Sequence, residues 1–237
     1  ATSKSIHPVL SAKSHEVITL ALPANLDGAI HPKAAKIIGS LLPEYDAIGI
    51  GCGMGTSVDS QNFIRLLLSE SHSRNMPTLI DADGLNNLSK IVKWWEQLPD
   101  NSVITPHPGE MARLTGVDVK EIQDRREQIT SDWASFWNVT IVLKGAFTVI
   151  ANAKGMIWIS PFANPILSTG GTGDVLSGII TGLMAQGVDT DAASCCGVYL
   201  HGAAGQALSE KFGGIGIASD LLPLIPQLIK SINDGGF

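Results

Sequence analysis

The run Ser168-Thr169-Gly170-Gly171-Thr172-Gly173-Asp174 holds the residues of this sequence that are best suited to chemistry. Its glycines permit a tight turn and let backbone amides approach a ligand closely. Apolar residues follow Asp174 at helical spacing, so the turn should open into a helix whose free N–H groups attract an anion. A carboxylate repels bound phosphate, so Asp174 would take a proton or hold a metal ion. The alternative is that Asp174 only caps the helix.

Two further clusters could serve the same site. Gly51-Cys52-Gly53-Met54-Gly55 would let a flat or phosphorylated ligand lie against the backbone, although it lacks the lysine of a P-loop. Asp81 and Asp83 could orient a hydrated Mg²⁺ ion, because Mg²⁺ binds proteins through one or two carboxylates and keeps several waters. The alternative for these two acids is that they cap the helix that follows them.

Two other clusters carry a histidine and a lysine. Pro106 and Pro108 fix the backbone around His107, which favours contact with a ligand, while Glu110 is expected as an acid at a helix start. Lys144 is suited to phosphate as a mobile point charge. The small residues around His201 favour a packing role, as does the spacing of the five tryptophans.

The elements that must position these residues alternate between strands and helices. Buried strands are predicted at 17–22, 46–50, 78–84, 102–105 and 140–143, with a hairpin formed by 147–151 and 156–160. Helices are predicted at 32–42, 63–71, 86–95, 119–137, 174–186, 189–212 and 219–232. This alternation predicts a parallel sheet covered on both faces, which binds ligands beyond the carboxyl ends of its strands. Residues 51–55, 81–84, 105–110 and 144–145 all lie at the carboxyl ends of predicted strands, so they are expected to form one site rather than unrelated turns.

The composition limits the function further. The 237 residues are 44% hydrophobic and are predicted to fold as a single domain, 1–237. A formal net charge of −6 argues against binding to nucleic acid or to an anionic membrane. The three cysteines show no metal-ligand spacing, which predicts a reduced, cytoplasmic setting. No apolar run reaches the roughly 20 residues that span a bilayer.

The sequence resembles the ADP/ATP-dependent NAD(P)H-hydrate dehydratases, a family within the ribokinase-like superfamily. The glycine–acid run is shared across that superfamily, whereas the histidine–proline block is more discriminating. The resemblance covers essentially the whole chain, and its blocks are 105–114, 142–150, 170–174, 199–204 and 218–221. It implies a three-layer α/β/α sandwich with a mostly parallel central sheet, but without the first strand and helix of the family.

The resemblance also implies an activity, a hydro-lyase reaction of metabolite repair. A nucleotide phosphorylates the ring hydroxyl of hydrated NADH or NADPH (NADHX, NADPHX), and loss of phosphate restores the double bond. Asp174 would be the general base. ADP is expected rather than ATP because the histidine–proline block is bacterial in style, and Mg²⁺ is expected with the nucleotide. The substrate-binding residues would be Gly53, His107 and Asp174, and the nucleotide-binding residues would be Lys144, Gly145, Ala146, Phe147, Thr148, Gly171, Thr172 and Gly173.

The resemblance further implies a homotetramer and a fused or separate NAD(P)HX epimerase as partner. Two other functions remain open from the residues. The glycine–acid run also fits another ribokinase-like small-molecule kinase. A truncated nucleotide-binding module without activity would keep Lys144 and Gly173 but lack a complete substrate pocket.

Overall fold

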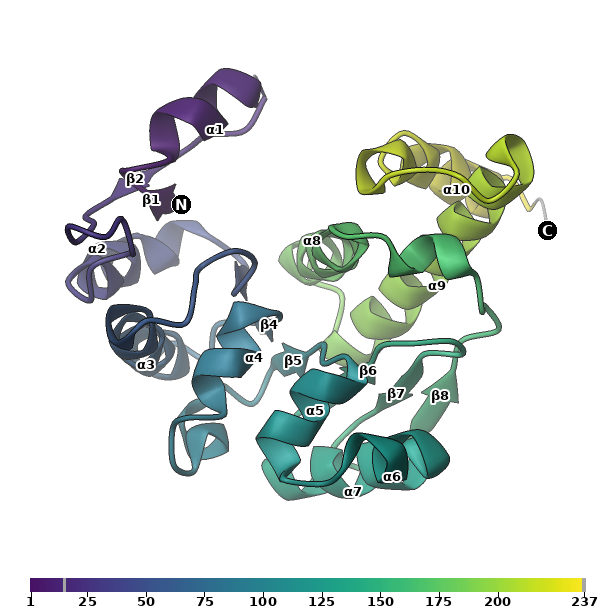
Figure 1. The fold of residues 1–237 in the computed structure, drawn as a ribbon, viewed down its shortest axis with the longest axis horizontal. Helices are drawn as coiled ribbons and strands as arrows, with labels where there is room; N and C mark the ends of the chain where they lie inside the picture. Colours follow the sequence, from purple (N-terminus) through teal and green to yellow (C-terminus); the bar gives the residue numbers. More distant parts are fainter. Residues whose placement is uncertain (15, 236–237) are drawn as a thin grey trace.

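The computed structural model describes residues 1–14 and 16–235, and its centre is a six-stranded sheet (Figure 1). The strand order is β3-β4-β5-β6-β7-β8, in which β3 to β6 are parallel and β7 and β8 are antiparallel. The strands are β3 (Ile48–Ile50), β4 (Thr78–Ile80), β5 (Ser102–Ile104), β6 (Thr140–Leu143), β7 (Val149–Ala151) and β8 (Ile157–Ile159). The predicted mostly parallel sheet and its hairpin are confirmed.

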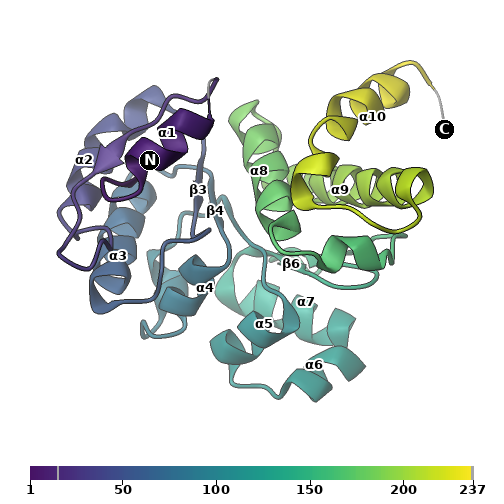
Figure 2. The same cartoon turned by 45° about the horizontal axis from the view of Figure 1, so that its top comes forward.

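Helices cover both faces of this sheet, which makes three layers (Figure 2). On one face, α8 packs against β3 and β4, and α9 packs against β5 and β6. That layer consists of α8 (Thr172–Ala185), α9 (Thr190–Phe212) and α10 (Leu224–Asn233). The other side carries α2 (Ala34–Leu41), α3 (Val58–His72), α4 (Asp83–Leu88), α5 (Pro108–Thr115), α6 (Val119–Asp124) and α7 (Arg126–Trp137).

The core follows from the alternation of side chains along the strands. Leu79, Val103 and Val142 point into the cluster under α8 and α9. Their neighbours Ile80, Ile104 and Leu143 point into the larger cluster on the opposite face. Successive side chains of a strand face opposite ways, so a strand that is buried on both faces must be apolar throughout. This explains the short apolar runs from which the strands were predicted.

The predicted buried strand at 17–22 is wrong in extent and in burial. Only Ala21–Leu22 is a strand, β2, and it pairs in parallel with β1 (Thr2–Ser3) in a separate small sheet, with helix α1 (His7–Lys13) between them. Ile18 is 95% exposed. No other strand within the described ranges pairs with the outer edge of β3. An apolar run indicates a strand but does not specify which strand it pairs with. The burial predicted for 17–22 depended on pairing within the main sheet, which the run alone does not determine.

Three predicted helices are interrupted. The helix predicted at 119–137 is α6 followed by α7, with the break at Arg125, whose φ is −134°. The helix predicted at 86–95 is the shorter α4, followed by a 3₁₀ turn at Trp94–Gln97. The segment 219–232 is divided at Pro223 into a 3₁₀ turn at Ala218–Leu221 and α10, because proline removes a backbone donor and limits helix continuity.

The tryptophans pack as predicted. Trp94 and Trp137 are buried, and their ring centroids lie 4.8 Å apart. The three cysteines, all within the described ranges, are free thiols. Across residues 1–14 and 16–235, no helix has the length and apolar character needed to cross a membrane.

Candidate active site

The glycine-rich turn opens α8 as the sequence predicts. Gly171 is the N-cap residue at φ 88°, a left-handed conformation that favours glycine, and a Cβ there would also lie 3.2 Å from the Cβ of Ala218. No side chain among the described residues caps this helix start. The Thr172 N–H donates to the Thr169 carbonyl at 3.3 Å, so within the described residues the N–H groups of Gly173 and Asp174 are the ones available to an anion at the positive end of the helix dipole.

Two cavities meet at the first turn of α8. One, of about 870 Å³, is lined mainly by apolar residues and by Gly53 and Asp174. The other, of about 510 Å³, is lined by Lys144 and Gly173 among others. Since Gly173 and Asp174 are adjacent in the chain, the turn separates the two spaces. An acid thus faces one cavity while the amide-rich turn faces the other.

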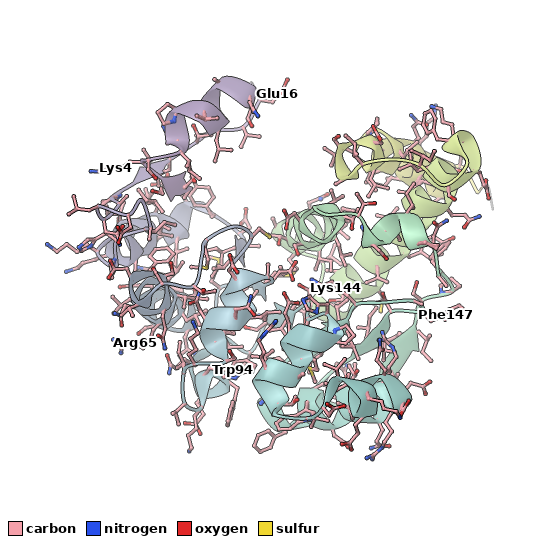
Figure 3. All side chains as sticks on the ribbon, viewed as in Figure 1. Lys4, Glu16, Arg65, Trp94, Lys144 and Phe147 are labelled. Atoms are coloured by element: carbon pink, nitrogen blue, oxygen red, sulfur yellow. The ribbon has the colours of Figure 1, made fainter. Side chains whose placement is uncertain are left out.

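A polar network joins three elements behind this turn. The Asp81 carboxylate, which follows β4, is 1% exposed. Its Oδ1 accepts hydrogen bonds from Lys144 Nζ at 2.6 Å and from the Ala82 N–H at 2.8 Å, and its Oδ2 accepts one from Ser177 Oγ at 2.6 Å. Lys144 therefore extends from the end of β6 toward the centre of the molecule (Figure 3).

His107 is the N-cap of α5. Its Nδ1 accepts from the N–H groups of Gly109 and Glu110 at 3.0 and 3.4 Å, while Glu110 Oε2 accepts from the His107 N–H at 2.8 Å. These bonds form a capping box, and Pro108 begins the helix. The Nδ1 atom is thus an acceptor, which places the proton of the neutral ring on Nε2.

The charge state of His107 follows from its position. Burial lowers the pKa of the His107 imidazole, an effect that exceeds the opposing influence of the Glu110 carboxylate. The ring is therefore neutral at neutral pH and presents an Nε2–H donor. The Nε2 atom lies 3.5 Å from Glu110 Oε1, and the side chain lines the same cavity as Lys144.

Cys52 is a site residue that the sequence reasoning missed as such. Partial burial and the neighbouring Asp174 carboxylate raise the pKa of its thiol to about 12, so the thiol stays protonated. The ligand atoms of Cys52, Asp81 and Asp174 lie within 4.8 Å of one another. The signal that could have identified Cys52 is its position in the glycine-rich segment 51–55, directly after β3.

His201 was predicted to pack, and it is 8% exposed, but it also lines the cavity that contains Lys144. Burial lowers the pKa of the His201 imidazole from 6.5 to about 4. Ser177 was missed as well, although it lies one helical turn after Asp174. The sequence spacing was the available signal for Ser177, whereas only the packing of α9 reveals His201.

The structure does not gather every predicted residue. Lys144, Gly145, Ala146, Thr148, Thr172 and Gly173 line one cavity together with His107, whereas Gly53 and Asp174 line the other. As the structure describes them, Phe147 and Gly171 lie outside both linings. Phe147 is 52% exposed. Asp83 Oδ2 accepts a hydrogen bond from the Gly55 N–H at 2.9 Å, which holds the glycine-rich segment 51–55 in place.

Comparison with curated proteins gives close matches. The chain is 36% identical over 235 residues to the bifunctional NAD(P)H-hydrate repair enzyme Nnr of Moorella thermoacetica. The matched region covers 99% of this chain and 44% of that protein. It is 38% identical over 181 residues to the ADP-dependent (S)-NAD(P)H-hydrate dehydratase of Neisseria meningitidis, covering 76% of this chain and 60% of that protein. The chain thus spans less than half the length of the first relative and about three fifths of the second.

Solved structures give the same result. The ADP/ATP-dependent NAD(P)H-hydrate dehydratase from Bacillus subtilis, co-crystallised with ATP/Mg²⁺ and soaked with CoA, matches with a TM-score of 0.78 at 31% identity. The match covers 97% of this chain and 78% of that one. A ribokinase-like superfamily protein from Enterococcus faecalis shares the fold, with a TM-score of 0.75 at 24% identity and coverage of 97% and 75%. A profile of the NAD(P)H-hydrate dehydratase family matches residues 1–227, and the chain belongs to that family.

Proposed function

We propose that this chain uses an adenine nucleotide to dehydrate hydrated NADH and NADPH back to NADH and NADPH. One observation carries the proposal: the Asp174 carboxylate lies in the first turn of a helix whose start has no side-chain cap. A base and an anion-binding turn in adjacent positions suit the phosphorylation of a hydroxyl. The named activities of the similar proteins support the choice of substrate.

The first step is phosphoryl transfer at the start of α8. Asp174 accepts the proton of the ring hydroxyl, whose oxygen then attacks the terminal phosphorus of the nucleotide. With ADP, the bond from that phosphorus to the bridging oxygen breaks, and AMP leaves with the bonding electrons. The first N–H groups of α8 and the Lys144 ammonium stabilise the charge on the transferred group.

The second step is elimination. Hydroxide is a poor leaving group, whereas the phosphate of a phosphate ester is a good one. The ring nitrogen donates its lone pair, the C–O bond to phosphate breaks, and inorganic phosphate departs. Loss of a proton from the adjacent ring carbon then restores the double bond. The balance is one hydrate and one ADP converted to one reduced cofactor, one AMP and one phosphate.

The two cavities suit the two substrates. The apolar cavity with Gly53 can receive the hydrated ring, because glycine lets a flat group approach the backbone. The cavity with Lys144 and Thr148 can receive the nucleotide. His107 lines the nucleotide cavity, so its Nε2–H would reach the hydrate only where the two ligands meet at the turn.

Magnesium fits the donor set in part. The carboxylates of Asp81 and Asp174 suit Mg²⁺, which prefers oxygen ligands and keeps several waters. The Cys52 thiol does not, because its raised pKa keeps it protonated. Asp81 also already accepts three hydrogen bonds. We propose that Mg²⁺ arrives with the nucleotide and that the Asp174 carboxylate would hold some of its waters, which would reduce repulsion between Asp174 and phosphate. Asp81 stays bonded to Lys144, Ala82 and Ser177.

The test uses the 237-residue chain itself, since the curated relatives are longer. Hydrated NADH is incubated with Mg²⁺ and either ADP or ATP while the absorbance of the reduced nicotinamide is followed. We expect recovery faster than the spontaneous rate, faster with ADP, and accompanied by AMP and phosphate. Recovery at the spontaneous rate would refute the activity, and a stable phosphorylated product would indicate another ribokinase-like kinase. The tetramer, the epimerase partner and the cytoplasmic location stay predictions.

A further inference from the structure

We propose that Asp81 is a positioning residue, which fixes the Lys144 ammonium against the first turns of α8 so that both act on the same phosphoryl group. This inference rests on the proposed function and extends it to a residue that touches neither substrate. It assigns Asp81 a task different from the magnesium site or helix cap expected from its sequence position.

The hydrogen bonds of Asp81 connect the elements that carry the reaction. Lys144 follows β6, and Ser177 lies three residues after Asp174 on α8. Both donate to the Asp81 carboxylate at 2.6 Å. One buried acid therefore determines where the ammonium lies relative to the helix that holds the base.

The same contacts place Lys144 beside the anion-binding turn. A Cβ built on Gly173 would lie 3.6 Å from Lys144 Nζ and 3.8 Å from Asp81 Oδ2. Lys144 is 20% exposed and lines the nucleotide cavity. An ammonium has three N–H donors, and the bond to Asp81 uses one of them. The remaining donors can reach a phosphate that is bound at the turn.

The backbone around Asp81 is strained in a way that holds this arrangement. Ala82 has φ 49° and ψ −123°, a conformation that is sparsely populated by residues with a Cβ. The Ala82 N–H donates to the Asp81 side chain in this conformation. Gly51 packs so closely that a Cβ on it would lie 1.9 Å from the Asp81 carbonyl oxygen. Both features fix the direction of the carboxylate.

The second acid near Lys144 does not replace Asp81. Glu110 Oε2 lies 3.8 Å from Lys144 Nζ and already accepts the His107 N–H at 2.8 Å. Replacing Asp81 with asparagine keeps the shape of the side chain but removes its charge. The ammonium would then move toward Glu110 and away from the turn. Displacement of a catalytic group by about 1 Å can lower a rate roughly 100-fold.

The test is a double-mutant cycle on the whole chain. The kcat for dehydration and the Kd for ADP are measured for wild type, Asp81→Asn, Lys144→Ala and the double variant. We expect kcat to fall roughly 10- to 100-fold in Asp81→Asn and about 100-fold in Lys144→Ala. The double variant should lie within about threefold of Lys144→Ala, because Asp81 acts through Lys144.

A matched control comes from another acid that accepts two side-chain hydrogen bonds. Asp191 accepts from Thr140 and Asn152 near the opposite end of β6, so Asp191→Asn should leave kcat within about twofold of wild type. Ala82→Gly offers a second route if Asp81→Asn fails to fold. It relieves the strained peptide without removing a charge, and we expect it to raise the melting temperature and lower kcat severalfold.

The outcomes separate this inference from the proposed function. If the fold-losses in kcat of the two single variants multiply in the double variant, the positioning role is overturned. It is also overturned if excess Mg²⁺ restores the kcat of Asp81→Asn. If wild type binds ADP without dehydrating the hydrate, the proposed function fails, while coupling in the Kd for ADP still supports the role of Asp81. If wild type binds no ADP, Lys144 serves no nucleotide and the positioning role fails too.

Discussion

Asp81 and Asp191 are two carboxylates at opposite ends of the same sheet, and each joins separate elements through hydrogen bonds. Asp191, in the first turn of α9, accepts from Thr140 Oγ1 at 2.8 Å and from Asn152 Nδ2 at 2.6 Å. Asp81 accepts from Ser177 and from the Lys144 ammonium. The Asp191 network uses neutral side-chain donors, while the Asp81 network includes a cation, the Lys144 ammonium, that borders a cavity.

The difference indicates what each network does. A carboxylate bound by neutral donors satisfies buried polar groups and stabilises the fold. A carboxylate that holds an ammonium beside an uncapped helix start also directs a charge toward a ligand. Strain supports the distinction, because Ala82 next to Asp81 has a positive φ. The number of side-chain hydrogen bonds alone would make the two acids look alike.

The largest expected effect is at Asp174. Asp174→Asn removes the general base but keeps the size of the side chain, so kcat should fall by about 10²–10⁴ while the Kd for ADP changes little. Steady-state rates and calorimetry measure the two quantities. An unchanged kcat would mean that Asp174 is not the base, and the contrast between the two ends of the sheet would lose its catalytic basis.

A smaller effect, on stability alone, is expected at Asp191. The amide of Asp191→Asn would direct donors toward Thr140 and Asn152, which are themselves donors and are buried. The free energy of unfolding should fall by about 1–3 kcal/mol, as measured by urea denaturation. A loss of kcat greater than that of Asp81→Asn would reverse the assignment of the two networks.

The smallest expected effect is a pH dependence from His201. Its pKa is about 4 in the folded chain against 6.5 for the ordinary group, so the unfolded chain binds more protons between these values. Stability from this group is complete above pH 6.5 and falls as the pH drops toward 4. His201→Leu should remove about 1–2 kcal/mol of the difference between unfolding free energies at about pH 7 and pH 5. An unchanged difference would mean that His201 is not neutral in the fold.

Much of the candidate site could be predicted because it lies at strand ends. Lys144, His107 and Gly173 each follow a short apolar run or a glycine turn, and parallel strands bring such ends together. Ser177 and His201 could not be assigned in this way. Both lie inside helices, where periodicity shows which side faces the core but not which cavity the core contains.

The fold shows a similar division. Residues 140–143 form a strand because all four are compatible with burial on both faces, and the sequence alone indicates this. The segment 17–22 has a comparable apolar run, yet only Ala21–Leu22 pairs, and it pairs with Thr2–Ser3. Strand pairing depends on contacts between residues distant in the chain, so local composition does not determine it.

By itself, the sequence determined the residue types of the reaction and the local backbone that presents them. Glycine at 171 permits a left-handed helix start, and the acid three residues later lies within the first turn whatever surrounds it. Only the tertiary structure decided that Asp81 joins Lys144 to Ser177. The bonds between these residues cross 63 and 96 positions of the chain, and side-chain contacts over such separations form only when the sheet and α8 pack together.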